Sequence, residues 1–137
     1  MKNERGFSLI ELLLVVAVIG IIDTLAVPAL QKATRAAENG NTFATMRTMS
    51  STQMNFMSQN GRFARLAELN SASSNALGTV SGLQLIRGKF VFEMPGTPTD
   101  TDLRGRYTIT ATRNVATEGV VYKYEIDQSG QIRQILP

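Results

Sequence analysis

The chain begins with a short charged segment followed by a long apolar stretch. Lys2, Glu4 and Arg5 lie in the first segment, and residues 7–30 are almost entirely apolar. About 24 helical residues extend roughly 36 Å, which is enough to cross the hydrocarbon core of a bilayer. Positive charge ahead of an apolar stretch favours a cytoplasmic N-terminus. The pattern therefore predicts a membrane-spanning stem over residues 7–30.

Two acidic residues interrupt this stem. Glu11 lies near its beginning, where a carboxylate is unfavourable in lipid unless something neutralises it. Farther along, Gly20 lowers helix stability, Asp23 offers competing backbone hydrogen bonds and Pro28 removes a helical donor. We expect the helix to be weakened over about residues 20–28. The weak stretch is either an extensible joint or a simple kink at which Asp23 reaches interfacial water.

Residues 31–60 have an amphipathic pattern. Apolar side chains recur at helical spacing and polar side chains occupy the other faces; the main apolar positions are Phe43, Met46, Met49 and Phe56. Asn60 and Gly61 tolerate the left-handed conformation and predict the end of the helix. The methionines suit either a binding groove or a seam between this helix and a sheet, and we interpret them as the seam.

The rest of the chain predicts a loop and a small sheet. Residues 61–88 have loop composition, with one short helical turn near Leu66. Alternation predicts a head of about four antiparallel strands over residues 89–137, at residues 89–94, 106–112, 120–126 and 131–135, with a turn at 127–130. The predicted fold class is α+β, with the C-terminal half of a long N-terminal helix packed on this sheet.

Composition narrows the chemistry. The chain has 137 residues, a net charge of +3, no cysteine and no histidine. It therefore has no disulfide, and it lacks both the commonest general base and the commonest metal ligand. No nucleophile–base spacing or phosphate-binding glycine loop is recognisable. We expect no enzymatic activity, cofactor or metal centre.

Three weaker features each have two interpretations. Asp100 and Asp102 form either a calcium site or a solvated turn, and the absence of EF-hand spacing favours the turn. The serines of the loop either carry O-linked sugars or form a bare polar loop, which we favour; they are Ser71, Ser73 and Ser74. The basic residues of the sheet either attract DNA phosphates or are scattered and solvated, which we favour; they are Arg104, Arg106, Arg113, Lys123 and Arg133.

The residues Gly6-Phe7-Ser8-Leu9-Ile10-Glu11-Leu12 resemble the prepilin signature of type IV pilins and type II secretion pseudopilins. In that family a membrane peptidase cuts after the glycine and methylates the new N-terminal phenylalanine. The resemblance implies a leader at residues 1–6, cleavage between Gly6 and Phe7, and N-methylation of Phe7. The family's glutamate corresponds to Glu11, and the proline of its first helix corresponds to Pro28.

The spacing of Phe7 and Glu11 gives the resemblance a physical meaning. Cleavage would leave an α-amino group on Phe7, and Glu11 would follow at i+4 on the same helical face. The amine and the carboxylate would attract each other strongly in an apolar bundle, within one subunit or between neighbours. We therefore expect Phe7 and Glu11 to set the register of packed stems. The alternative, a plain signal peptide, would be cut after its apolar stretch, whereas the cut implied here lies before it.

The resemblance implies a structural subunit of a type IV pilus, the major pilin, that polymerises with copies of itself. Its other partners would be the prepilin peptidase, the assembly machinery and the bacterial inner membrane, which holds the precursor before the pilus becomes extracellular. The head would serve adhesion, motility or DNA uptake. The alternatives are a minor pilin, a pseudopilin in a periplasmic pseudopilus, or a membrane-anchored binding domain that does not polymerise.

Overall fold

The computed structural model describes residues 5–137, so residues 1–4 of the expected leader lie outside it. Contacts within the chain divide it into two compact units, one ending at Glu38 and the other running from Asn39 to Pro137. The long helix α1, Leu9–Asn60, contributes to both units. We call residues 9–38 the stem and residues 39–137 the head, and we describe each separately.

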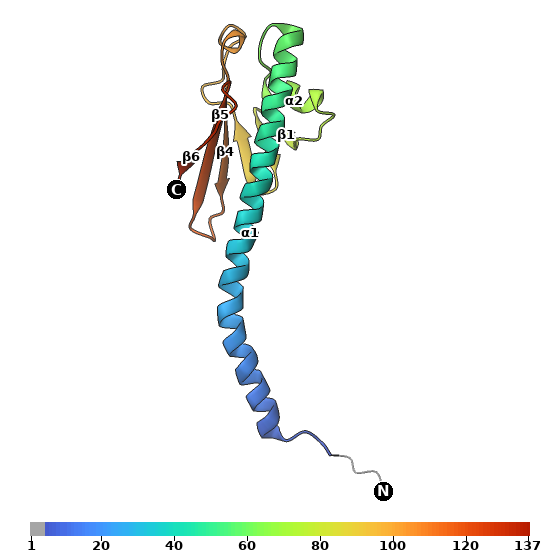
Figure 1. Ribbon diagram of the computed structural model, residues 1–137, viewed down its shortest axis with the longest axis vertical. Coiled ribbons are helices and arrows are strands. Elements are labelled where there is room, and N and C mark those ends of the chain that lie inside the picture. The colour runs from blue at the N-terminus through green and yellow to red at the C-terminus, as the bar shows by residue number, and fades with distance from the viewer. Residues whose placement is uncertain (1–4) are drawn as a thin grey trace. The chain divides into compact units, whose positions relative to one another are not determined.

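The stem is helical throughout, including the stretch that we expected to be weak (Figure 1). A helix break at Gly20, Asp23 and Pro28 is therefore wrong for the isolated chain. Glycine and proline each weaken a helix interior, but the apolar turns on both sides keep their own hydrogen bonds. The Thr24 hydroxyl also donates to the Ile21 carbonyl at 2.7 Å, so it bonds within the helix. Weakening in an assembled filament stays a prediction.

The head contains a sheet of six antiparallel strands, where we predicted about four. The strands follow one another in chain order, so each pairs with its sequence neighbours (Figure 1). They are β1 Thr79–Ser81, β2 Gln84–Arg87, β3 Phe90–Glu93, β4 Thr108–Asn114, β5 Val121–Asp127 and β6 Ile132–Leu136. The two extra strands, β1 and β2, lie in the region we expected to be a loop. The last four correspond to the predicted strands.

Two short helices complete the head. α2 spans Leu66–Ala72 and confirms the short helical turn, although it is longer than expected. A 3-10 turn, η1, spans Asp102–Arg104. The predicted end of α1 is also confirmed, because the helix stops at Asn60 and Gly61 follows with a φ of 70°.

The core of the head lies between α1 and the sheet. Met46 and Met49 of α1 are fully buried among apolar side chains from the strands, which confirms the predicted methionine seam. Phe43 meets Tyr124 edge-to-face at 4.7 Å between ring centroids. The buried strand residues include Leu85, Phe90, Phe92, Ile109 and Ile126. Packing of this kind stabilises the head through its own chain alone.

Gln53 joins α1 to the segment that follows it. Its side-chain amide donates to the Ala64 carbonyl at 2.8 Å, and its side-chain oxygen accepts from the Ala64 N–H at 2.7 Å. Gln53 and Ala64 are both fully buried. A buried backbone donor and acceptor both need partners, so this one side chain satisfies two groups that water cannot reach.

Candidate functional site

The Gly6–Phe7 peptide lies ahead of α1 in non-helical, exposed chain. The Phe7 side chain is 93% exposed. A Cβ atom built on Gly6 meets no atom within 4 Å, so the fold itself does not require glycine there. A peptidase needs an accessible, non-helical peptide bond, and this segment provides one beside an exposed aromatic side chain.

Glu11 caps the beginning of α1. Its carboxylate accepts the backbone N–H of Ser8 at 2.8 Å, and the Leu12 N–H donates to the Ser8 carbonyl at 3.2 Å. This is half of a capping box, in which the third helical residue satisfies the N-cap amide. We did not predict this role, although Ser8-x-x-Glu11 is the sequence signature of such a cap. Glu11 is therefore held beside the residue that cleavage would leave at the N-terminus.

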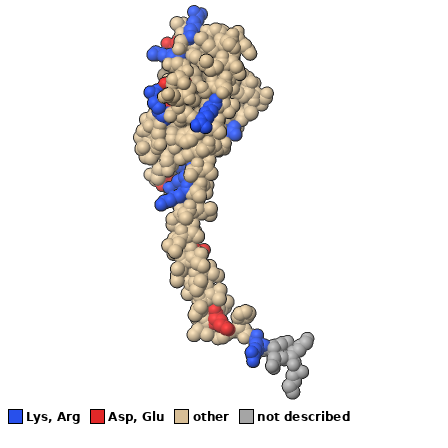
Figure 2. Space-filling model, in the orientation of Figure 1, with Lys and Arg blue, Asp and Glu red and all other residues tan. Residues whose placement is uncertain are grey.

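The stem exposes its apolar side chains. Exposed fractions range from 77% at Leu9 to 47% at Val18, and Leu30 is still 69% exposed. α1 contains a window long and apolar enough to cross a membrane, and none of that window is buried within the protein. Figure 2 shows this surface as mostly uncharged. A large exposed apolar surface marks a site that contacts lipid or another protein.

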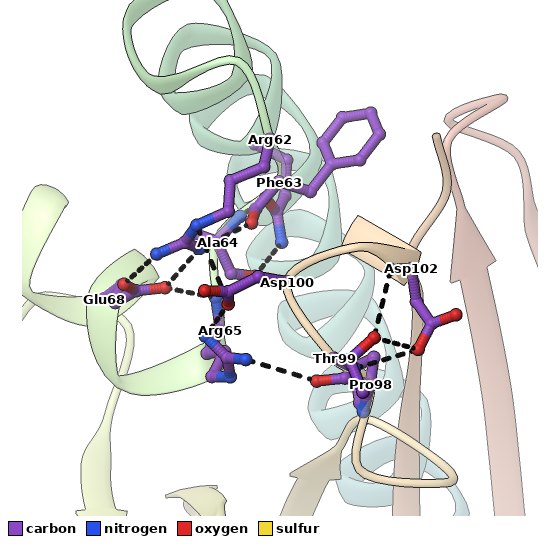
Figure 3. A network of polar contacts seen from close by, with 10 residues as sticks. Arg62, Phe63, Ala64, Arg65, Glu68, Pro98, Thr99, Asp100 and Asp102 are labelled. Carbon is purple, nitrogen blue, oxygen red and sulfur yellow. Dashed lines mark hydrogen bonds and ion pairs between the residues drawn. The ribbon is translucent and has the colours of Figure 1, made fainter. Parts of the chain in front are cut away.

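The head holds its own polar network where the end of α1, α2 and the chain before η1 meet (Figure 3). Arg62 binds Glu68 through two hydrogen bonds of 2.6 and 2.9 Å, and Arg65 forms an ion pair with Asp100 at 2.6 Å. The hydrogen bond from Arg62 lowers the pKa of Glu68 to about 2. Glu68 also accepts the Arg65 N–H at 2.9 Å. These contacts tie three segments of the head together.

The two aspartates considered for calcium have separate roles in this network. Asp100 pairs with Arg65, whereas Asp102 accepts hydrogen bonds from the Thr99 N–H and hydroxyl at 2.9 and 2.7 Å. The Thr99 hydroxyl lowers the pKa of Asp102. Among residues 5–137, no group of three acidic side chains is placed to hold a metal ion. These contacts favour the interpretation of Asp100 and Asp102 as part of a turn over the interpretation as a calcium site.

Two of the basic residues considered for DNA binding are engaged by carboxylates. Arg113 is fully buried and binds Glu118 at 2.8 Å, and Arg133 binds Asp127 at 2.5 Å. Ser73, one of the serines considered for sugars, has its hydroxyl 3.4 Å from that of Thr52. The pairing of Arg113 and Arg133 favours the interpretation of scattered charges over a DNA-binding patch.

Comparison with known proteins identifies the N-terminal segment. Residues 1–22 match the family described as the prokaryotic N-terminal methylation motif. The chain therefore carries the N-terminal methylation motif, followed by an apolar helix and a head with an antiparallel sheet.

A 65-residue stretch of the chain resembles the type IV major pilin protein PilA of Myxococcus xanthus (strain DK1622), with 33% identity. The stretch covers 47% of this chain and only 30% of that relative. No solved structure matches the chain.

Proposed function

We propose that this protein is a structural subunit of a type IV pilus, and specifically its major pilin. One observation carries the proposal: an apolar stem that its own chain leaves uncovered begins directly after the accessible Gly6–Phe7 bond. The match of residues 1–22 to the methylation motif and the likeness to a protein named as a major pilin support it. The protein would therefore act by assembling into a filament. The only covalent steps would be cleavage after Gly6 and methylation of Phe7 during maturation.

Maturation starts in the inner membrane. The stem spans the lipid with residues 1–6 in the cytoplasm, and the prepilin peptidase cuts after Gly6 and methylates Phe7. The new α-amine lies on the residue next to Ser8, four residues before Glu11 in the sequence. Because Glu11 already turns toward the Ser8 N–H, its carboxylate is positioned to accept the amine of its own chain or of a neighbour.

Assembly then replaces lipid with protein. The pilus machinery lifts mature subunits from the membrane, and their stems pack against each other in the filament core. The amine–Glu11 pair makes the carboxylate tolerable there, since an unpaired charge in an apolar core is strongly unfavourable. The folded head remains in water on the outside of the extracellular filament, where its ligands, including DNA or surfaces, would bind.

A minor pilin or a secretion pseudopilin is the second candidate, because the Gly6–Glu11 signature fits it equally well. Such a subunit would occupy the pilus tip or a short periplasmic filament. A membrane-anchored binding domain is less suitable, because in a monomeric anchor Glu11 would serve only as a helix cap, and capping does not require a carboxylate in lipid. Abundant surface filaments built of this chain would favour the major pilin.

The test is to purify surface filaments from cells that express the chain and to determine its N-terminus by mass spectrometry. The proposal expects a methylated Phe7 as the first residue of the main filament subunit. Chains that keep Met1 in a monomeric membrane fraction would refute it. Processed chains found only in periplasmic filaments would favour the pseudopilin.

A further inference from the structure

Asp23 is the second acidic residue of the stem. Its side chain is exposed, and among residues 5–137 no hydrogen bond or ion pair joins it to another group. Its neighbour Thr24 differs, because the Thr24 hydroxyl already bonds to the Ile21 carbonyl. A carboxylate that enters an apolar environment needs a cation or a proton. When lipid or protein covers the stem, Asp23 therefore needs a cation or a proton, and its own chain provides no cation beside it.

The same chain cannot supply that cation. The next basic residue after Asp23 is Lys32, nine residues later. On a helix this spacing places Lys32 about 14 Å along the axis and about 180° around it, so the two side chains point away from each other. The amine of a processed Phe7 would lie beyond the beginning of α1 at Leu9, which is already about 21 Å along the axis in the other direction. A partner for Asp23 must come from another molecule.

Lys32 has the properties of that partner in a second copy. It is exposed, and within the described residues it makes no hydrogen bond or ion pair. Arg35, the next cation, is less suitable because it already has an interaction within its own chain. Because Asp23 and Lys32 lie on opposite faces of one helix, each copy presents an acid on one side and a base on the other.

We propose that Asp23 of one copy pairs with Lys32 of the next copy when stems pack together. The contact is head-to-tail, because the two surfaces that meet are different, and such a contact propagates as an open filament. This inference rests on the proposed function and adds a second electrostatic contact to the one at Glu11.

A charge exchange tests the pair in cells that carry the assembly machinery and produce this chain as their filament subunit. Asp23→Lys and Lys32→Asp should each reduce sheared filament at least about tenfold, because each places two like charges together. The double exchange, Asp23→Lys with Lys32→Asp, should recover most of the filament. The matched control is Asp23→Lys with Arg104→Asp, which has the same net charge but cannot form the pair and should not recover.

Crosslinking gives a second readout that leaves the pair intact. The chain has no cysteine, so Thr24→Cys and Ala33→Cys can be co-expressed as single variants beside Asp23 and Lys32. A short bis-maleimide should link Thr24→Cys copies to Ala33→Cys copies in filaments, and it should not link Thr24→Cys copies to each other.

The outcomes separate this inference from the proposed function. If the unaltered chain forms no filaments, the proposed function fails and the pair fails with it. Normal filament yield in Asp23→Lys would overturn only the pair, with Asp23 then facing water. Absence of recovery in the exchanged double variant, or crosslinks between like positions, would overturn it as well.

Discussion

The stem and the head differ in what covers their apolar side chains. In the head, Phe92 and Met49 have no exposed surface, whereas in the stem Leu14 is 64% exposed and Leu25 is 74% exposed. The head therefore obtains its stability from its own chain. The stem has hydrogen-bonded backbone and no core, so lipid or other copies must cover its side chains. The head thus buries its apolar side chains without a partner, whereas the stem buries its own only against lipid or another copy.

The largest expected effect comes from the junction ahead of the stem. Gly6→Val should abolish filaments while precursor accumulates in the membrane, because the peptidase would no longer accept the residue before the cut. The fold should be unaffected, since a Cβ at Gly6 meets nothing within 4 Å. Immunoblotting of precursor and mature chain, together with the yield of sheared filaments, measures this. Normal processing of Gly6→Val would refute the assigned cleavage site.

The next effect separates the two units directly. Phe92→Ala should lower the free energy of unfolding of the head by about 3–5 kcal/mol, because a fully buried aromatic side chain is lost from the core. Urea unfolding of the full chain in detergent, followed by tyrosine fluorescence, measures it. The matched control is Leu14→Ala, which should change head unfolding by less than about 0.5 kcal/mol. Equal destabilisation by both variants would contradict the division into a self-contained head and an uncovered stem.

A smaller loss is expected at the clamp after α1. Gln53→Leu keeps a similar volume but leaves the Ala64 N–H and carbonyl buried without partners. We expect a loss of about 2–3 kcal/mol in head stability, since each unsatisfied buried group is unfavourable. Gln59→Leu, a substitution at an exposed position of the same helix, serves as the control in the same urea assay. Equal stability of the two variants would show that the amide is not needed.

The smallest effect depends on pH. The pKa of Glu68 is about 2 in the folded head, below its ordinary value of 4.5, so its contribution is present above pH 4.5 and is lost as the pH falls toward 2. Because the Glu68 side chain is 35% exposed, solvent screening limits this contribution to roughly 1 kcal/mol. Unfolding measured between pH 6 and pH 2.5 should show a weaker acid dependence for Glu68→Gln. An unchanged dependence would mean that the Arg62 contact contributes nothing.

Some of this architecture could be predicted from the sequence and some could not. The stem, the end of α1 at Asn60 and the 127–130 turn follow from local patterns, and the turn is closed by the Gly130 N–H bonded to the Asp127 carbonyl at 3.0 Å. The pair β1 and β2 was missed because both strands are short and Leu85 is the only buried residue in either. Gly78 lies in the predicted loop, where loop composition alone does not report that a side chain at this position would meet the Ile86 carbonyl oxygen at 2.5 Å.

The candidate site divides in the same way. Gly6, Phe7 and Glu11 are recognisable from their spacing, and the cap between Ser8 and Glu11 could have been predicted from its signature. The Gln53–Ala64 clamp depends on two segments meeting in space, so no local pattern reports it. The expected break at Asp23 was wrong for the isolated chain because the helical turns on either side outweigh the local propensities of Gly20, Asp23 and Pro28.

The central claim is that other copies cover the stem, and site-specific labelling tests it most directly. Because the chain lacks cysteine, Val16→Cys in the stem and Gln128→Cys in the head each provide a single thiol at an exposed position. Purified, detergent-washed filaments are treated with a polar maleimide, and solubilised subunits are treated in parallel after denaturation. The account predicts that Val16→Cys is protected in filaments and Gln128→Cys is labelled, with both labelled after denaturation. Equal labelling of the two positions in intact filaments would contradict it.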